Sequence, residues 1–470
     1  MKRLNGVDSF MLRMETSKAY MHTFKIAIID PSTDPDGWSF DKFRTEAERR
    51  IHLIPVLRWR YLDSPLGLNH PYWVEDPDFQ LDYHIRRIAC PPPADHKNLC
   101  AFMADIYSYQ LDRDRPLWMM WVVEGLADGT VACVMLVHHA YVDGVGASWL
   151  MQRFYHPRPG IKVDDPPPYA PPPLPSRLTR LGWALRDFPE VAIGNMPKVA
   201  AGMWRRFALE RKRKSAGLPA HPTAGQMKQT PLNINLSAGR TFVCDSVPLA
   251  DFVAVSKALD VTINDVFSGC AAGAVRRLLV DLDHDPDSHP LIAATPFAGD
   301  RPTGMEGLGN FATQDFCWLR SDVADPLRRL AASHQANVEM KEHLGQVRDA
   351  GADISALLQV VPPWGITLIR KAIHRRGGSF GFFGNLVLSN VPGPKEPLYL
   401  DRWKLDKWFS TGQLVDGTAL NITMWSYDGQ ANICILTDRQ VLQDGWRLYG
   451  YFIDELHALR TVAETKAVAP

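Results

Sequence analysis

The run of sequence that decides the fold spans residues 131–146 and reads VACVMLVHHAYVDGVG. Its first seven residues, 131–137, are apolar at every position, which predicts a strand buried on both faces of a sheet. His138 and His139 follow directly, and Asp143 comes four residues after His139. Polar side chains at the end of a buried strand are held by a rigid element and still reach a cleft, so we expect a functional site here.

Two adjacent histidines in extended backbone point to opposite faces, so His138 and His139 should not converge on one metal ion. The sequence offers no further ligand pair at the spacing of a zinc site, and we expect no metal. A neutral imidazole can take a proton from an alcohol or an amine near pH 7. One histidine would then face a cavity as a general base while the other faces the interior. The alternative is that both are merely hydrogen-bonded residues at a strand end.

The charges of the chain balance, with 52 Lys and Arg against 52 Asp and Glu in 470 residues. Proteins dedicated to nucleic-acid binding usually carry a basic excess, so we expect no nucleic-acid partner. With 46% apolar and 22% charged residues, the chain can bury enough apolar surface to fold. Its length suggests two or three domains.

The cysteines predict a reducing compartment, because the seven of them include no CxxC pair and several lie in apolar runs. They stand at positions 90, 100, 133, 244, 270, 317 and 434. Residues 1–8 lack an apolar signal-peptide core, and the apolar run 131–137 is far too short to span a bilayer. We expect a cytoplasmic protein whose contact with membranes is at most peripheral, at the inner face of the plasma membrane or on lipid droplets.

Proline divides the chain. Nine of the nineteen residues from 157 to 175 are proline, so this stretch should be a stiff extended spacer. A segment with helical spacing follows and ends in a basic cluster. We therefore expect an N-terminal unit at 1–156, a spacer and basic helical connector at 157–232, and a C-terminal unit at 233–470.

Both units mix strand and helix patterns, so the predicted fold class is α/β. In the first unit we expect strands at 24–29, 118–123 and 131–137 and helices at 40–51 and 97–109. In the second unit we expect helices at 264–280 and 443–457 and strands at 291–295, 386–389, 420–425 and 430–436.

The run HHAYVDG (138–144) fits the HHxxxDG motif of CoA-dependent acyltransferases and condensation-type enzymes. More specifically, the chain resembles the bacterial wax ester synthase/acyl-CoA:diacylglycerol acyltransferase family over almost its whole length. Further matching runs are MKRLNGVDSFMLRMET (1–16), DPDFQLDYHIRR (76–87), DRPLW (114–118), TINDV (262–266), SNVPGP (389–394) and LNITMWSYDG (420–429). HHxxxDG alone is shared by several branches, whereas its combination with Pro-Leu-Trp, Asn-Asp and SNVPGP is much more specific.

The resemblance implies two chloramphenicol-acetyltransferase-like domains joined by a connector, with the catalytic histidine in a tunnel between them. It implies that His139, next to His138, is the general base that deprotonates an acceptor hydroxyl, which then attacks the thioester of a long-chain acyl-CoA. Acyl-CoA would be a co-substrate, with no further cofactor and no acyl-enzyme. Diacylglycerol, giving triacylglycerol, is the expected acceptor. The alternatives are a fatty alcohol giving wax ester, acyl transfer from a carrier protein, and a non-catalytic lipid-binding protein.

The resemblance also implies a structural role for Asp143, which in relatives holds its loop through an arginine. Arg301, in the loop after the strand at 291–295, is the expected partner, and Arg115 is the second candidate. Gly144 predicts a sharp exit from strand to helix or a close backbone approach.

Polar residues in three of the matching runs are further candidates. Asn264 and Asp265 begin a predicted helix, where they could cap it or act at the tunnel. Ser389 and Asn390 end a predicted strand and could bind a developing oxyanion or the pantetheine arm, or only turn the chain. Asn421 belongs to another predicted strand and is a further binding candidate.

Two basic amphipathic segments, 203–214 and 364–376, bear on membrane contact. Basic residues beside apolar surface can bind anionic lipid. The alternative is a solvated helix face.

Overall fold

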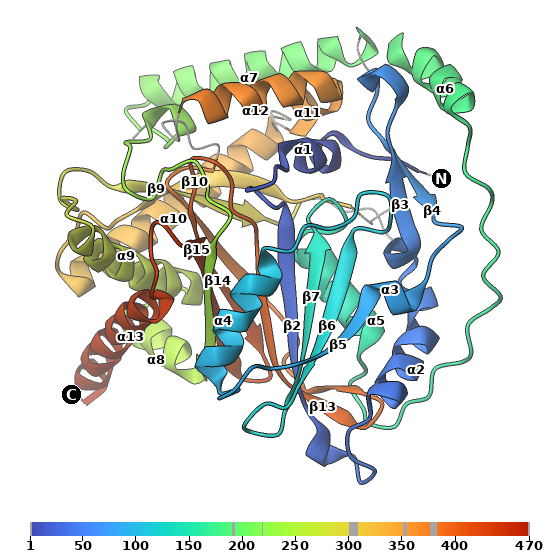
Figure 1. Ribbon diagram of the computed structural model, residues 1–470. Coiled ribbons are helices and arrows are strands. Elements are labelled where there is room, and N and C mark those ends of the chain that lie inside the picture. Colours follow the sequence, from blue (N-terminus) through green and yellow to red (C-terminus); the bar gives the residue numbers. More distant parts are fainter. Residues whose placement is uncertain are drawn as a thin grey trace.

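The computed structural model describes residues 2–189, 193–218, 220–299, 309–350, 355–376 and 383–468. Two large sheets lie next to each other, and helices cover them (Figure 1). The α/β class predicted from the sequence is confirmed. The expected strands and helices all occur, with ends that differ by a few residues, except that the last helix continues to residue 468.

The first large sheet carries the HHxxxDG run. Within the described residues its order is β12-β13-β2-β7-β6-β5. The strands are β2 His22–Asp30, β5 Ile85–Ala89, β6 Trp118–Glu124, β7 Val131–His138, β12 Leu398–Leu400 and β13 Trp403–Thr411. The apolar strand β7 lies between β2 and β6, so both of its faces are covered and both of its edges are paired.

Two strands of this sheet come from the C-terminal part of the chain. Strand β13 pairs antiparallel with β2 and places Trp408 opposite Ala27 and Thr411 opposite Phe24. Strand β12 pairs in turn with β13. Residues 398–411 therefore belong to the first sheet in space, although they follow the spacer in the sequence.

The second large sheet has the order β10-β9-β11-β14-β15-β8 in the described residues. Its strands are β8 Arg240–Pro248, β9 Leu291–Phe297, β10 Thr313–Leu319, β11 Leu386–Pro392, β14 Leu420–Tyr427 and β15 Gln430–Asp438. Helices α8 Leu249–Leu259, α9 Ile263–Asp281, α10 Pro326–Asp349 and α13 Gly445–Val468 accompany this sheet. Helix α9 contacts the other three and is buried along most of its length, which its small residues permit.

Shorter elements complete the N-terminal part. A small sheet has the order β1-β4-β3, and its strands are β1 Lys2–Arg3, β3 Trp59–Leu62 and β4 Tyr72–Glu75. The helices are α1 Gly6–Met14, α2 Phe40–Arg50, α3 Leu81–His84, α4 His96–Tyr107 and α5 Gly144–Phe154. Helix α1 packs against two helices from the far end of the chain, α11 Ser355–Val360 and α12 Pro363–Arg375. Gly6 allows this approach, because a Cβ there would lie 2.3 Å from the Leu358 backbone.

The proline-rich spacer contains no regular helix or strand from residue 157 to residue 176, as predicted. It runs in extended form along one side of the molecule (Figure 1). The connector then forms α6 Arg177–Pro189 and α7 Met196–Ser215, which lie at the top of the molecule in the same view.

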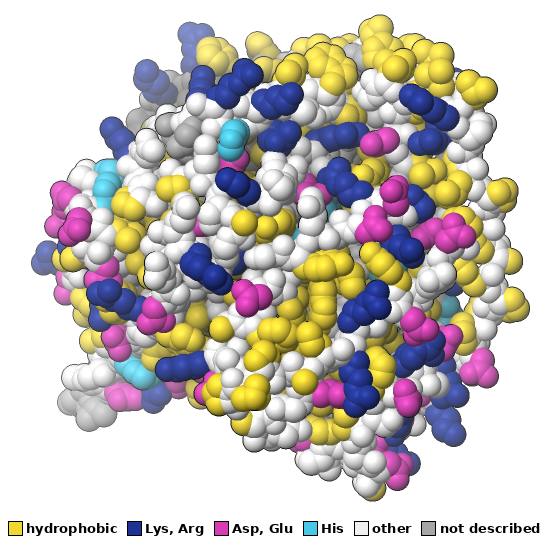
Figure 2. Space-filling model, in the orientation of Figure 1, with side chains coloured by type: hydrophobic (Ala, Val, Ile, Leu, Met, Phe, Trp, Pro, Cys, Tyr) yellow, Lys and Arg dark blue, Asp and Glu magenta, His cyan; other side chains and the backbone are white. Residues whose placement is uncertain are grey.

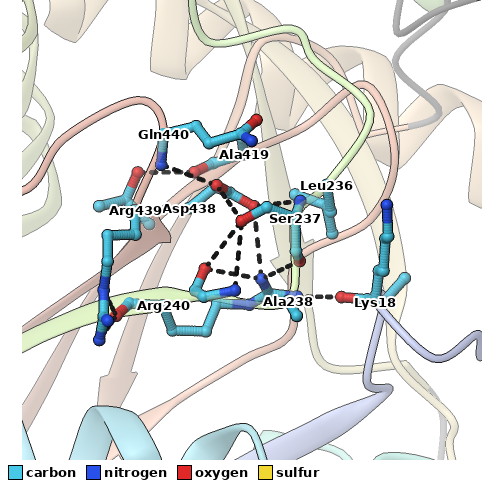
Figure 3. A network of polar contacts seen from close by, with 12 residues as sticks. Lys18, Leu236, Ser237, Ala238, Arg240, Ala419, Asp438, Arg439 and Gln440 are labelled. Atoms are coloured by element: carbon cyan, nitrogen blue, oxygen red, sulfur yellow. Dashed lines mark hydrogen bonds and ion pairs between the residues drawn. The ribbon is translucent and has the colours of Figure 1, made fainter.

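A buried ion pair joins two neighbouring strands of the second sheet, β8 and β15. Arg240 Nη1 lies 3.3 Å from Asp438 Oδ2, and both side chains are fully buried. The same guanidinium donates to the backbone carbonyl of Lys18, which precedes β2 (Figure 3). Asp438 also accepts from the backbone amide and the hydroxyl of Ser237 at 2.6 and 2.7 Å. This network holds the N-terminal segment against the second sheet.

Candidate active site

The HHxxxDG run forms the link between β7 and α5. Strand β7 ends at His138, and α5 begins at Gly144. Asp143 is the N-cap of α5, and its Oδ1 accepts from the Gly146 amide at 2.9 Å. A short acidic side chain at this place satisfies a free amide and complements the helix dipole.

His138 points into the protein interior. The imidazole is fully buried, and its Nδ1 accepts a hydrogen bond from the Ala140 amide at 3.1 Å. Its Nε2 lies 3.7 Å from Glu15 Oε2, and Nε2 of the buried His22 lies 4.0 Å from the other oxygen of Glu15. Burial lowers the pKa of His138 well below the usual range, so its imidazole is neutral at pH 7. His138 was also predicted as a site residue. In the structure its ring belongs to a buried polar cluster in the protein interior.

The side chain of His139 points to the opposite side from that of His138, and His139 is partly exposed. Its Nδ1 lies 3.0 Å from Oδ1 of Asn310. Burial lowers the pKa of the His139 imidazole, and the nearby Lys25 ammonium lowers it further. The ring is therefore neutral at pH 7, which is the state that a general base requires.

The side chain of Asn310 is fixed by α1. Its amide nitrogen Nδ2 donates to Asp8 Oδ1 at 2.9 Å and also to the backbone carbonyl of His139. The backbone amide of Asn310 donates to the same Asp8 oxygen at 2.9 Å. Burial raises the pKa of Asp8 to about 7. Neither residue was predicted, although the run 1–16 that contains Asp8 was one of the matching runs.

Lys25 is a buried cation close to His139. It lies on β2, in an otherwise apolar stretch, and its Nζ donates to Ser410 Oγ on β13 at 2.8 Å. Burial lowers the pKa of Lys25 to about 8. A lysine within an apolar strand is a visible signal in the sequence, but its pairing with a residue 385 positions away is not.

The second oxygen of Asp143 binds the loop that carries Asn310. Asp143 Oδ2 accepts from the Phe311 backbone amide at 2.9 Å. The expected partner Arg301 lies outside the described residues. The second candidate, Arg115, instead contacts Asp112 at 3.5 Å and lies over the Tyr83 ring.

Two of the predicted C-terminal candidates, Asn264 and Asn390, lie close to each other, and the residue after Asn390 lies close to the start of α5. A Cβ on Gly144 would lie 3.5 Å from a methyl group of Val391, which follows Asn390 in the run SNVPGP. Asn390 Nδ2 in turn lies 3.4 Å from Asn264 Oδ1, and all three of Asn264, Ser389 and Asn390 are partly exposed.

Asp265 and Asn421 form hydrogen bonds with residues of neighbouring elements. Asp265 forms a capping box with Thr262 and also accepts from the side chains of His334 and Asn337 on α10 at 2.7 and 2.8 Å. Asn421 is buried on β14, and its Oδ1 accepts from the Thr423 hydroxyl at 2.8 Å. Asn421 Oδ1 also accepts from the hydroxyl of Thr411 on β13 at 3.3 Å, so Asn421 links the second sheet to the first, whereas Asp265 links α9 to α10.

Comparison with known proteins identifies the family to which the chain belongs. The family model described as the wax ester synthase/diacylglycerol acyltransferase catalytic domain matches residues 4–267, and the WS/DGAT C-terminal domain matches residues 308–460. The chain belongs to the wax ester synthase/diacylglycerol acyltransferase family. A Mycobacterium tuberculosis protein named as a diacylglycerol O-acyltransferase is 46% identical over 99% of this chain and 98% of its own length. The predicted family is confirmed, and the protein is an acyltransferase.

Solved structures agree with the acyltransferase fold. The wax ester synthase/diacylglycerol acyltransferase from Marinobacter aquaeolei VT8 matches with a TM-score of 0.69 at 24% identity, over 99% of this chain and 100% of that chain. The first condensation domain of the calcium-dependent antibiotic synthetase matches with a TM-score of 0.57 at 14% identity, over 98% and 96%. These similarities confirm the two sheet-and-helix domains that were predicted.

An apolar cavity of about 60 Å³ lies inside the first half of the acyltransferase. Strands β2, β6 and β7 line it with residues that include Lys25, Met120 and Val137, and α5 contributes Leu150 and Met151. Val137 is two positions before His139. The predicted tunnel between the domains stays a prediction, because this cavity lies within the first sheet's layer.

Two clusters of the acyltransferase offer three metal-ligating atoms each within the described residues. In the first, Cys100 Sγ and Cys244 Sγ are 3.8 Å apart, and His96 Nε2 already donates to the Cys244 carbonyl at 2.6 Å. All seven cysteines are free and buried. The polar atoms of this cluster are thus satisfied by one another.

The second cluster lies where the connector meets the second sheet. Asp315 accepts from His221 Nε2 and His343 Nδ1, both at 2.7 Å. The two imidazole rings are stacked with centroids 3.5 Å apart and an interplanar angle of 14°. A metal between stacked rings would lie outside both ring planes, where the nitrogen lone pairs do not point. The arrangement therefore fits a structural clamp, and the absence of a metal site remains a prediction.

Proposed function

We propose that this acyltransferase moves a long-chain acyl group from acyl-CoA to the hydroxyl of diacylglycerol, giving triacylglycerol, with His139 as the general base. The observation that carries the proposal is the His139 ring, which is neutral, partly exposed and held through Nδ1. The name of the Mycobacterium tuberculosis relative supports diacylglycerol as the acceptor.

In the proposed reaction, Nε2 of His139 takes the proton of the acceptor hydroxyl. The oxygen attacks the carbonyl carbon of the thioester and forms a tetrahedral intermediate. The intermediate collapses when the carbon–sulfur bond breaks, and the imidazolium returns its proton to the sulfur, so that an ester and free CoA leave. We propose direct transfer, so that the acyl group passes from CoA to the acceptor oxygen without an acyl-enzyme.

The negative charge of the intermediate needs hydrogen-bond donors. Asn390 and Ser389 are the proposed donors, because Val391 in the same run packs near Gly144 at the start of α5. Asn264 would orient the Asn390 amide through its 3.4 Å contact. Removal of one such donor typically costs about 100- to 1,000-fold in kcat.

The test measures thiol release from palmitoyl-CoA with diacylglycerol or hexadecanol offered separately. We expect release with diacylglycerol, triacylglycerol as the product, and loss of release in His139→Ala. Intact-protein mass spectrometry after incubation with palmitoyl-CoA alone should find no acylated chain. Release with neither acceptor, at any acyl length, would contradict the proposal.

The outcomes also separate the alternatives. Turnover with hexadecanol alone would indicate a wax ester synthase, and turnover only with an acylated carrier protein would indicate carrier-dependent transfer. Membership of an acyltransferase family argues against the non-catalytic lipid-binding protein.

The acyltransferase also presents an apolar surface, which we call the α7–α12 face and define by Met203, Trp204, Phe207, Trp364, Leu368 and Ile369. Trp204 is 70% exposed, Phe207 67% and Trp364 57%. Figure 2 shows hydrophobic side chains along the top of the molecule, where Figure 1 places these helices, with Lys and Arg among them. No helix within the described residues is long and apolar enough to cross a membrane. Peripheral lipid contact through this face fits a lipid acceptor.

Flotation with vesicles that contain anionic lipid tests the α7–α12 face. We expect Trp204→Ser with Phe207→Ser to weaken binding, because both side chains are exposed apolar groups flanked by basic residues. Val280→Ser, which removes an apolar side chain from α9 that is 58% exposed, is the control. Unchanged flotation of the double variant would exclude this surface.

A further inference from the structure

The loop at 309–311 is attached to the HHxxxDG loop along its whole length. Gly309 forms a parallel bridge with Val142, and the Phe311 amide donates to Asp143. Between them, Asn310 contacts both the ring and the backbone of His139. A residue 171 positions away in the sequence is thereby held against the imidazole.

The hydrogen bonds of Asn310 define which way its amide faces. Its nitrogen Nδ2 lies next to two groups that accept, the carbonyl of His139 and Oδ1 of Asp8. An NH₂ group can only donate, so the amide must place its nitrogen there and its oxygen toward His139. That oxygen can only accept, so the proton of the neutral imidazole is on Nδ1. The lone pair is then on Nε2.

Several contacts keep this amide in place. Asn5 Nδ2 donates to the Asn310 carbonyl at 3.1 Å, and Asn5 Oδ1 accepts from the Asp8 amide at 2.7 Å. Gly309 has a φ of +117°, and a Cβ on it would lie 2.9 Å from Asp8 Oδ2. Glycine is therefore needed before Asn310, both for the backbone conformation and for the approach of Asp8.

We propose that Asn310 is the positioning residue of the base, which fixes the His139 tautomer with its lone pair on Nε2, and that Asp8 fixes the amide of Asn310. The chain is His139 Nδ1–H to Asn310 Oδ1 and Asn310 Nδ2–H to Asp8 Oδ1, so an amide stands between the imidazole and a carboxyl group. The inference rests on the proposed role of His139 as general base. It gives the first helix of the chain, α1, a part in the reaction.

Asn310→Ala removes the side-chain acceptor for Nδ1–H and leaves the backbone carbonyl of His139 itself, which also hydrogen-bonds the ring. The ring should then be held less firmly in one tautomer and one orientation. We expect kcat to fall about 10- to 100-fold while KM for palmitoyl-CoA stays within about 2-fold, because the lost interaction acts on the base rather than on the substrate. Asn310→Asp keeps an acceptor and adds a negative charge beside the ring. It should restore part of kcat and move the acidic limb of the kcat/KM profile to higher pH, because a carboxylate favours the imidazolium.

One charged group near the ring changes in these variants: Asp8 loses the side-chain hydrogen bond from Asn310 that lowers its pKa, so it stays neutral to a higher pH. The remaining charged groups are the same. Lys25 and Asp143 act on the pKa of His139, and His138 is its neighbour in the chain. Asn385→Ala is the matched control, because Asn385 is also a buried amide that bridges backbone groups, at Ile292 and Lys228. It should lower the free energy of unfolding and leave the pH profile unchanged.

Nitrogen-15 spectra of labelled imidazoles test the tautomer without relying on the folding of an Asn310 variant. The His139 signal is identified by its loss in His139→Ala, and we expect a protonated Nδ1 and an unprotonated Nε2. A protonated Nε2, or an Asn310→Ala enzyme with wild-type kcat and pH profile, would overturn the inference. If His139→Ala keeps its turnover, the proposed function fails instead, so the two failures are distinguishable.

Discussion

The carboxylate of Asp143 accepts one hydrogen bond from the Gly146 amide and one from the Phe311 amide, each at 2.9 Å. Its two oxygens thus join the start of α5 to a loop that follows 168 residues later. Asp143 therefore fixes the loops next to His139, and these two hydrogen bonds run to backbone amides rather than to the His139 ring.

Asp143→Asn should mainly reduce stability. An asparagine has one acceptor oxygen, so either Gly146 or Phe311 loses its partner in a buried place, at a cost of about 1–3 kcal/mol. Urea unfolding would measure this loss. The folded fraction should keep most of its kcat, and the acidic limb of kcat/KM should move to lower pH, because the charge of Asp143 raises the pKa of His139. A large loss of kcat in a well-folded variant would instead support a catalytic role.

Lys25→Met should raise the pKa of His139. The ammonium beside the ring disfavours the imidazolium, and methionine removes the charge at a similar volume. Because His139 must be neutral to act, the acidic limb of kcat/KM should move to higher pH. Ser410→Ala removes the hydrogen-bond partner of Lys25 but keeps its charge, so it should leave the profile in place. Equal profiles for Lys25→Met and wild type would contradict this coupling.

Asp438→Asn should destabilise the protein by about 3–5 kcal/mol, because it leaves the fully buried Arg240 guanidinium without its opposite charge. Asp454→Asn breaks the exposed pair with Arg277 and serves as control, with an expected change below about 1 kcal/mol. Equilibrium unfolding in urea measures both. Similar losses in the two variants would show that the network in Figure 3 does not lock the halves together.

Acid should loosen the clamp between the connector and the second sheet. Burial alone would raise the pKa of Asp315, but the hydrogen bonds from His221 and His343 outweigh it and lower the pKa to about 2, below the ordinary 3.8. A carboxyl group whose pKa is lower in the folded protein stabilises it above pH 3.8, and this stability is lost as the pH falls toward 2. Burial also lowers the pKa of His221 below 6.5, so its protonation in acid favours the unfolded chain as well.

Limited proteolysis between pH 7 and pH 4 can follow the contribution of His221 to this clamp, because the contribution of Asp315 is lost only below pH 3.8. The basic end of α7, next to the His221 segment, should become more sensitive to trypsin as the pH falls, after correction for the pH dependence of trypsin itself. Asp315→Asn should show that sensitivity already at pH 7, because its amide cannot accept from both imidazoles. Asp287→Asn, an exposed partner of Arg276, should behave like wild type.

Local patterns predicted the elements that have a clear period. The apolar run of β7, the strand pair β6–β7 and helix α9 were found where expected. Strand β13 and helix α10 were missed. In β13 (WKLDKWFST) charged residues interrupt the apolar ones, and its place in the sheet depends on pairing with β2 from the other end of the chain. The amphipathic segment at 364–376 was predicted, but only its fold divides the buried Ile366 and Ile373 from the exposed Leu368 and Ile369.

The sequence by itself determined the family, the α/β class, the extended spacer and the histidine pair at the end of β7. These features depend on neighbours within a few residues, whose side chains alternate or repeat along one element. Only the tertiary structure decided what surrounds His139. Asn310 and Asp8 lie 171 and 131 positions from His139, and they meet it because chain reversals bring α1 and the 309–311 loop to the end of β7. Such contacts leave no periodic trace in a single sequence, because each is specified by packing between distant elements.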